Sequence, residues 1–330
     1  MAQRWLVCGI IFALGAAGTL AARGHSPRAA GTMPENRSTT PRLLPLKPHP
    51  VVALTFDDLP AAGGVRPGIT RVGIATRLTG ELRANRLKGV YGFVNAVDLG
   101  GDPDAQHALR IWIDTGMNIG NHTWSHPSLS SDTADAFEHD IALDEPALRQ
   151  YAGRRDWHWF RYPYLEEGGT MEKRNGVRDW LHQHGYRIAE VTLNFNDDDW
   201  GDPYLRCLTQ HNQAEIAWLQ KTYLESAAQS IPQEREEEQI AYGHEIPNVL
   251  LLHATEFTTL MLPSLMRLLK QEGFRFATLP RVEKNRAYAV NATAELPDGG
   301  TLVEEVLAAR HLNAPPVWPE PADQLDSVCR

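Results

Sequence analysis

The sequence has no run rich in Lys and Arg, no internal repeat and no glycine-rich phosphate loop after its first predicted strand. Its 32 Lys and Arg residues are outnumbered by 41 Asp and Glu residues, which gives a formal net charge of −9. A negative chain without a basic cluster argues against nucleic acid as a partner. The missing phosphate loop removes the usual sequence sign of a nucleotide site.

Long apolar runs are also missing, with one short exception near the N-terminus. There Arg4 precedes an apolar run over 5–20, and small residues follow it. This is the pattern of a secretory signal peptide, and the run is short for a membrane span. We predict a signal peptide over 1–22 and a disordered linker over 23–48. The protein would then be exported to the periplasm, cell envelope or extracellular space. After cleavage it would keep no stable membrane span. A retained membrane anchor is the alternative.

Cysteine is scarce, with three residues in 330. Cys8 lies in the predicted signal peptide, so the exported chain would keep Cys207 and Cys329. In an oxidising compartment these two could form a disulfide that ties the C-terminal tail to the body of the protein. Two free thiols are the alternative.

The remaining sequence alternates between short apolar runs and segments with helical spacing. The apolar runs are hydrophobic on both faces, which indicates a parallel sheet covered by helices. Seven such runs favour an α/β fold of the (β/α) barrel type over a doubly wound open sheet. The acidic run over 234–238, in a long helical segment, is typical of a solvated helix face. The predicted strands are 51–56, 90–94, 118–122, 159–161, 186–192, 248–253 and 274–277.

Two adjacent carboxylates, Asp57 and Asp58, follow the first apolar run. Like charges at the end of a buried strand raise each other's pKa, and the low dielectric penalises both ionised forms. A metal ion that takes one carboxylate and leaves the other to handle protons would relieve this cost. A simple turn is the other interpretation, because Asp and Pro are common turn residues.

Histidines at positions 122 and 126 follow the third predicted strand. Two His with this spacing can direct both imidazoles to one point when the backbone turns helically. Together with Asp58 they form a set of two imidazoles and one carboxylate. Zinc suits this set, and Fe(II), Co(II) or Ni(II) would also fit.

Further polar residues follow the next three strands. Arg161 comes after the fourth and could hold a carboxylate through its planar fork, while a backbone N–H beyond Pro163 could face a developing oxyanion. The Asn196–Trp200 segment follows the fifth strand, and His253 ends the sixth. Barrel enzymes place their sites at such strand ends.

Five short segments together resemble the motifs of the NodB-homology polysaccharide deacetylases, carbohydrate esterase family 4, in the same order. They are Thr55–Asp58, His122–His126, Arg161–Tyr164, Asp199–Trp200 and Leu251–His253. The resemblance runs from about residue 51 to residue 279. It implies a distorted (β/α) barrel of about seven parallel strands.

The resemblance implies a role for each matching residue around one divalent metal ion, most simply zinc. Asp58, His122 and His126 would be the metal ligands. Asp57 would be the general base that activates a metal-bound water, and Arg161 would orient it.

On the leaving-group side, the resemblance implies that His253 is the general acid and that Asp199 tunes its pKa. The backbone N–H of Tyr164 would help to stabilise the oxyanion. Trp200 and Leu251 would line the pocket for the acetyl methyl group. Amide hydrolysis needs such an acid for a poor leaving group, and His is the side chain best able to supply it near pH 7.

The sequence also departs from the family pattern. Leu59 stands where the family commonly has Gly, and Asn196 stands where the fourth motif often has Asp. We expect a deacetylase domain over 49–281 with a helical insertion at about 201–247 that caps the groove, followed by a C-terminal extension over 282–330.

The implied function is that of a secreted, metal-dependent hydrolase. It would act on an acetylated polysaccharide and remove N-acetyl groups from N-acetylglucosamine units of peptidoglycan or a chitin-like polymer. An O-acetyl esterase of the xylan type is the close alternative, because an ester depends less on the acid His253. A noncatalytic carbohydrate-binding protein and an Fe(II) oxygenase with the same ligand set are the alternatives from other classes.

Overall fold

The computed structural model describes residues 50–62, 68–290 and 294–330. The predicted signal peptide and linker lie outside the described residues. Seven parallel strands form one sheet in the order β5-β4-β3-β2-β1-β6, and β7 pairs with the start of β1. The strands are β1 (Val51–Leu59), β2 (Tyr91–Val94), β3 (Asn118–Asn121), β4 (Trp159–Phe160), β5 (Arg187–Ile188), β6 (Asn248–His253) and β7 (Arg275–Phe276).

The sheet curls until its two edges meet. The segment that follows β5 reaches the free edge of β6, where Leu193 forms a parallel bridge with Leu250. The N–H of Leu193 donates to the carbonyl of Val249, and the N–H of Leu251 donates to the carbonyl of Leu193, both at 3.1 Å. The predicted distorted (β/α) barrel of seven parallel strands is therefore confirmed, although β4, β5 and β7 are only two residues long each.

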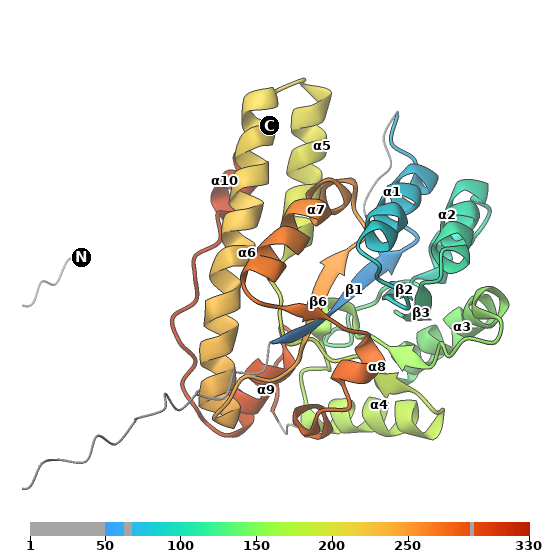
Figure 1. Ribbon diagram of the computed structural model, residues 1–330. Coiled ribbons are helices and arrows are strands. Elements are labelled where there is room, and N and C mark those ends of the chain that lie inside the picture. The colour runs from blue at the N-terminus through green and yellow to red at the C-terminus, as the bar shows by residue number, and fades with distance from the viewer. Residues whose placement is uncertain (1–49, 63–67, 291–293) are drawn as a thin grey trace, which may run out of the picture. The chain divides into compact units, whose positions relative to one another are not determined.

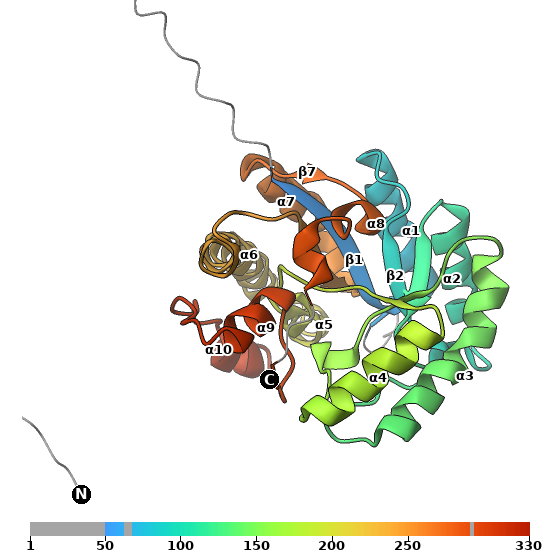
Figure 2. The same ribbon diagram turned by 90° about the horizontal axis from the view of Figure 1, so that it is seen from below.

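The helices surround this sheet (Figures 1 and 2). Several begin at a Thr, Asp or Asn whose side chain accepts a backbone N–H of the first turn, which is why they start where they do. These N-caps include Thr70, Asp102, Thr133, Thr170, Asn212 and Thr255. The helices are α1 (Arg71–Ala84), α2 (Pro103–Asp114), α3 (Ala134–Ala152), α4 (Met171–Gln183), α5 (Gly201–Thr209), α6 (Gln213–Tyr242), α7 (Glu256–Gln271), α8 (Leu279–Val282), α9 (Leu302–Ala309) and α10 (Ala322–Ser327).

Strand β1 is the centre of the core because neighbours cover both of its edges and both of its faces. Val52, Leu54 and Phe56 are buried, and Phe56 packs edge-to-face on Trp112 of α2 with ring centroids 5.7 Å apart. Leu59 is also buried, so the residue that replaces the family's Gly serves as a core side chain. A strand that is buried on both faces has to be apolar throughout, which is what the sequence showed.

The segment predicted as a helical insertion holds α5 and the 30-residue helix α6. The C-terminal extension packs α9 against α6 (Figure 2). A disulfide joins Cys207 of α5 to Cys329, with the two Cα atoms 5.1 Å apart. The C-terminal end of the chain is thus tied to the helical insertion.

The acidic run on α6 was predicted to form a solvated helix face, and the structure shows most of its glutamates buried. Glu234, Glu237 and Glu238 are buried, and only Glu236 of the run's glutamates is exposed. The buried three lie three and four residues apart, on one face of the helix. Sequence periodicity could not show this, because residues 246–248 and the C-terminal extension together cover that face.

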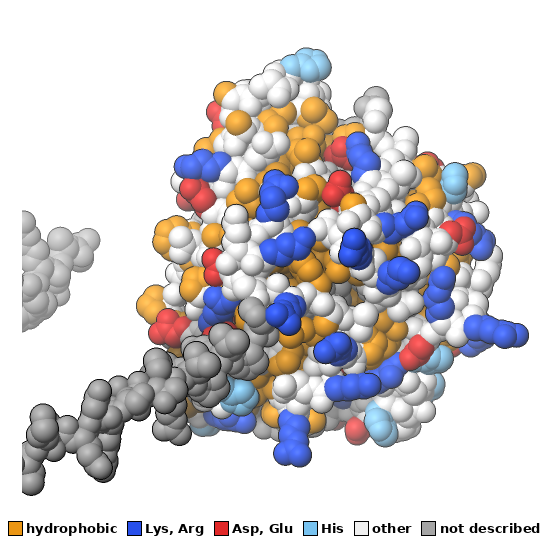
Figure 3. Space-filling model, in the orientation of Figure 1, with side chains coloured by type: hydrophobic (Ala, Val, Ile, Leu, Met, Phe, Trp, Pro, Cys, Tyr) orange, Lys and Arg blue, Asp and Glu red, His pale blue; other side chains and the backbone are white. Residues whose placement is uncertain are grey.

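Charge is unevenly distributed over the surface. The face in Figure 3 carries many Lys and Arg side chains and few acidic ones, although the chain as a whole is negative. Among the described residues, no helix is both long enough and apolar enough to cross a membrane.

Candidate active site

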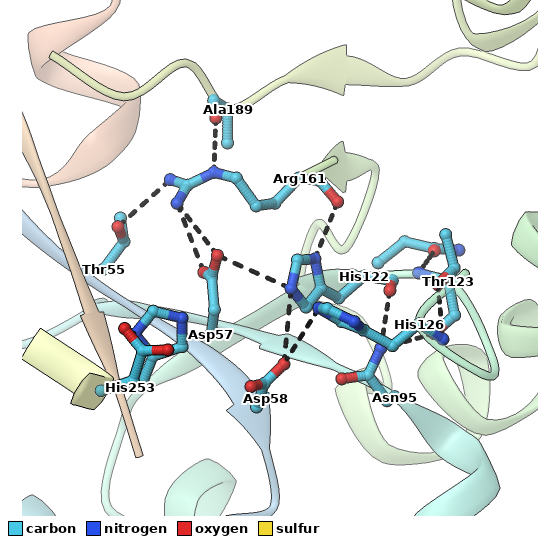
Figure 4. Close-up of polar contacts among 12 residues, drawn as sticks. Thr55, Asp57, Asp58, Asn95, His122, Thr123, His126, Arg161, Ala189 and His253 are labelled. Carbon is cyan, nitrogen blue, oxygen red and sulfur yellow. Dashed lines mark hydrogen bonds and ion pairs between the residues drawn. The ribbon is translucent and has the colours of Figure 1, made fainter. Parts of the chain in front are cut away.

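Polar side chains from four strands meet at the carboxyl edge of the sheet (Figure 4). Asp57 and Asp58 come from β1, His122 follows β3, Arg161 follows β4, and His253 ends β6. Because the strands are parallel, their carboxyl ends open on the same side. A cavity of about 580 Å³ lies there, lined by the two aspartates, His122, His126 and His253 among others.

Asp57 is the buried member of the aspartate pair. Its side chain lies against Arg161, whose Nη1 donates to Oδ1 at 3.3 Å and to Oδ2 at 3.2 Å. Burial raises the pKa of Asp57 to about 6, against the lowering effect of the Arg161 charge. A carboxylate with this pKa can accept a proton near neutral pH and release it again.

Asp58 faces two histidines. Its Oδ1 lies 3.5 Å from His122 Nε2 and 3.5 Å from His126 Nε2. Among the described residues, this buried oxygen has no hydrogen-bond partner. The three ligand atoms lie within 4.8 Å of one another, so the donor set of one carboxylate and two imidazoles fits a divalent metal ion.

The two histidines are held in a state suited to metal binding. His122 Nδ1 lies 2.8 Å from the carbonyl oxygen of Arg161, so an Nδ1–H donates there and leaves the Nε2 lone pair facing Asp58. Burial, helped by His126, lowers the pKa of His122 well below its usual 6.5. The His122 ring is therefore neutral at pH 7, as a metal ligand must be.

The histidine pair comes together through a loop and not through the helical turn that the spacing suggested. Thr123 and His126 both have left-handed backbones, with φ of 67° and 59°. Asn95 fixes this loop by donating its amide to the carbonyl oxygens of His122 and Thr123, at 2.6 and 3.1 Å. Asn95 had no signal in the sequence, because it follows β2, where no motif residue was expected.

Arg161 is almost fully buried and connects the proton-handling carboxylate with the metal ligands. Its Nε donates to the carbonyl of Ala189 at 2.7 Å, and its Nη2 donates to Thr55 Oγ1 at 3.1 Å. The guanidinium also lies over the ring of Phe93, 4.7 Å from its centroid. The planar fork therefore has a single orientation, which fixes Asp57 in turn.

His253 differs from its prediction in the identity of its partner. Its Nδ1 donates to Asp197 Oδ1 at 2.8 Å, and its backbone N–H donates to the same carboxylate. Thr258 Oγ1 also donates to Asp197, at 2.6 Å. Asp199, which we expected to tune His253, is exposed on the same 3-10 turn (Asp197–Trp200). Three consecutive aspartates offered the sequence no means of choosing among them.

The partner matters because it sets the charge of the ring. Burial lowers the pKa of His253, but the hydrogen bond and the charge of Asp197 raise it more, so the value lies well above 6.5. His253 is therefore an imidazolium at neutral pH. Such a ring can donate a proton across the cavity from the Asp58–His122–His126 set.

The predicted pocket residues divide into two groups. Leu251 and Tyr164 line the cavity, as expected. Trp200 does not, because its ring is fully buried against Tyr223 and its Nε1 donates to Thr222 Oγ1 at 3.0 Å. The expectation that Trp200 would line the acetyl pocket is therefore wrong, since this ring supports α6 from inside the core.

Tyr164 has a left-handed backbone with φ of 58°, and its ring lies edge-on to His126 with centroids 4.5 Å apart. No acceptor in the described part of the chain takes its backbone N–H. This leaves the N–H available to a ligand at the rim of the cavity, where the sequence predicted it.

Comparison with known families agrees with the motif resemblance. The family model described as polysaccharide deacetylase matches residues 46–189. This range holds the first three motifs, from Asp57 and Asp58 through Arg161 and Tyr164. Asp197 and His253 lie beyond it, so they rest on the geometry above.

Among solved structures, the chain is similar to a chitin deacetylase from Colletotrichum lindemuthianum, with 22% identity over 72% of this chain and 88% of that one and a TM-score of 0.46. It is also similar to a family 4 acetyl xylan esterase from Clostridium thermocellum, in complex with a cobalt ion, with 21% identity over 71% and 90% and a TM-score of 0.46. A family pseudoenzyme from Bacillus anthracis is 15% identical over 71% of this chain and 65% of its own, with a TM-score of 0.48. No activity of this chain follows from these similarities.

Proposed function

Because the chain belongs to the polysaccharide deacetylase family, we propose that it is an exported, metal-dependent hydrolase. Its substrate is a polysaccharide such as peptidoglycan or a chitin-like polymer, and it removes the N-acetyl groups from the N-acetylglucosamine units. One arrangement carries this proposal. A metal-ligating set, Asp58, His122 and His126, lies in the same cavity as a carboxylate of raised pKa and an imidazolium.

A divalent ion held by Asp58, His122 and His126 would supply Lewis acidity toward the acetyl carbonyl and lower the pKa of water. Zinc suits the donor set, and cobalt, nickel or iron would also fit. Asp57 accepts the proton of the attacking water, in an orientation fixed by Arg161.

The other residues act on the acetyl oxygen and on the leaving group. The Tyr164 N–H donates to the oxygen of the acetyl group as negative charge develops there. His253 delivers the proton that the departing sugar amine needs, and Leu251 contacts the acetyl methyl. Asp197 keeps His253 charged until the proton is needed.

The Asp197–His253 pair favours an amide over an ester substrate. An amine leaves as a neutral molecule only after it has gained a proton, whereas an alkoxide from an O-acetyl group depends less on an acid. A buried carboxylate that keeps a histidine protonated above neutral pH is the device that amide cleavage requires. O-acetyl ester hydrolysis is the second candidate within the same chemistry.

The two other classes fit the site less well. A noncatalytic binding protein would be expected to lack a ligand or the base, and here all of these residues converge on one cavity. An Fe(II) oxygenase could use the same two His and one carboxylate, but such sites usually sit on a β-sandwich, and this sheet is parallel and covered by helices.

The experiment is acetate release from N-acetylglucosamine oligomers by protein loaded in turn with zinc, cobalt, nickel and iron. We expect release by the wild type and a loss of about 10³-fold or more in kcat for Asp57→Asn, because the base is removed while the metal ligands remain. Metal content is measured in parallel. Full activity of Asp57→Asn, or the absence of acetate release from a fully metal-loaded protein, would overturn the proposal.

A further inference from the structure

A second cavity of about 290 Å³ adjoins the first. The two share part of their lining, including Tyr164, Asn194 and Asp298. The far wall of the second cavity consists of α6, the start of α9 and the segment 317–320. These elements lie side by side in Figure 2, and all of them come from the helical insertion or the C-terminal extension.

The C-terminal extension is fitted closely to the loop that carries Tyr164. Gly299 has φ of 76°, and a Cβ at this position would lie 2.2 Å from the Tyr164 carbonyl oxygen. Only a glycine allows this approach of the two backbones. The wall of the second cavity is therefore built into the fold next to the reactive site.

The charges that line this cavity all have one sign. Glu234, Asp298, Glu304 and Glu320 contribute carboxylates, and among the residues that the structure describes the lining contains no Lys, Arg or His. Two of the four are occupied by protein donors: the N–H of Thr301 donates to Glu304, and the Asn196 amide donates to Glu320. Glu234 is not occupied in this way.

Glu234 is 7% exposed, and its Oε2 is buried without a hydrogen-bond partner among the residues described. Burial raises its pKa well above the usual value, and the charged groups that contribute are also carboxylates, those of Glu237, Glu304 and Glu238. A buried carboxyl oxygen without a partner destabilises the fold. Glu234 belongs to the lining of a cavity next to the active site, so its carboxyl group is suited to a ligand that brings a positive charge.

The remaining lining suits a sugar ring better than a bare metal ion. Trp318 and Tyr164 offer aromatic surface, and the Trp318 backbone is anchored by its N–H to Gln233 Oε1 at 3.1 Å. Ser226 and Ser230 offer hydroxyl groups. Aromatic surface for the C–H face of a ring, together with neutral hydrogen-bonding groups for its hydroxyls, is the usual composition of a specific small-molecule site.

We propose that this cavity is a second saccharide subsite that takes a hexosamine unit with a free, protonated amine, and that Glu234 accepts the hydrogen bond of its ammonium group. The inference rests on the proposed function, because removal of an N-acetyl group leaves such a unit in the polymer. An enzyme with this subsite favours a chain that already contains a deacetylated unit over a fully acetylated chain.

The test is isothermal titration calorimetry on the metal-loaded protein at about pH 6, where sugar amines are protonated. The probes are a glucosamine tetramer and an N-acetylglucosamine tetramer. We expect Glu234→Gln to weaken binding of the glucosamine tetramer by about tenfold or more, because it removes a charge-assisted hydrogen bond. Glu236→Gln, an exposed change of the same kind on the same helix, is expected to bind as the wild type does.

A second variant and a stability measurement separate loss of the subsite from loss of the fold. Ser230→Tyr adds bulk to the wall of the cavity and leaves every carboxylate of its lining in place, and it is expected to weaken binding of the glucosamine tetramer as well. Thermal unfolding of both variants without ligand, compared with the wild type, shows whether each one keeps the fold.

Unchanged binding of the glucosamine tetramer by Glu234→Gln would overturn the inference, and so would equal binding of both tetramers by the wild type. Binding does not depend on turnover, so the two proposals can fail separately. Glu234-dependent binding without any acetate release would refute the proposed function and leave the subsite standing. Acetate release without Glu234-dependent binding would refute the subsite and leave the proposed function standing.

Discussion

Replacing Asp197 with Asn tests whether the protein works by protonating a leaving amine. Asp197 is fully buried and holds the His253 ring at 2.8 Å and the Thr258 hydroxyl at 2.6 Å. Burial alone would lower the pKa of His253, and the charge of Asp197 keeps it well above 6.5. Asn has almost the same shape and no charge, so the variant loses the strongest of the groups that raise this pKa, while Asp198 and Asp58 remain.

The size of the effect follows from the bond that is weakened. A hydrogen bond to a charged group contributes about 1.5–3 kcal/mol, which corresponds to about 10- to 150-fold in rate. We expect a fall of this order in kcat for an N-acetylglucosamine oligomer at pH 7. Hydrolysis of an activated aryl acetate ester should fall by less than about threefold, because its leaving group needs no acid.

The pH profile gives a second readout with a definite sign. In the wild type, His253 has a raised pKa, so the protonated acid is present at neutral pH and is lost as the pH rises through that value. The alkaline fall of kcat should therefore move to lower pH in Asp197→Asn. The measurement is acetate release between pH 5 and about pH 10, with thermal unfolding to show that the variant is folded.

Asp199→Asn is the matched control, since it removes the same charge from the same turn without touching the His253 ring. Its kcat should stay within about threefold of the wild type. The reasoning fails if Asp199→Asn loses as much activity as Asp197→Asn. It also fails if the alkaline fall of Asp197→Asn coincides with that of the wild type.

Three further changes test other parts of the structure. Arg161→Lys keeps the charge but loses the fork that holds Asp57, so kcat should fall about tenfold or more while metal content, measured by mass spectrometry, is unchanged. His126→Gln should lower metal affinity by about 10-fold or more in a competition titration with a chelator, because one of three protein ligands is lost. The Cys207–Cys329 disulfide spans 122 residues, and its removal should lower the free energy of unfolding, measured in urea, by up to about 5 kcal/mol. A reductant should reproduce this loss in the wild type.

The barrel could be predicted because its information is local. The central strands carry apolar runs, several helices show a 3.6-residue period, and parallel strands bring their carboxyl ends to one edge. The contact that closes the barrel could not be predicted, because no period in the sequence marks the short pairing of the Leu193 segment with β6.

The acidic run on α6 shows why burial is harder to predict than helix formation. Its charge indicated a solvated face, and α6 is indeed a helix, but three of its glutamates are buried under segments that follow the helix in the sequence. Glu238, for example, accepts the Ile246 N–H at 3.0 Å and the Asn248 amide. These partners come from beyond the helix, so the helix sequence alone carries no sign of them.

The paired aspartates show how a local irregularity makes the site possible. Neighbouring residues on a regular strand point to opposite faces of the sheet, so Asp57 and Asp58 could not both line one cavity there. The pairing of β1 with β2 shifts register between Phe56 and Leu59, and Asp58 has φ of 60°. Asp is one of the few residue types that tolerates this left-handed backbone. The distortion directs Asp58 to the histidines while Asp57 stays against Arg161, so the two carboxylates can do different work one residue apart.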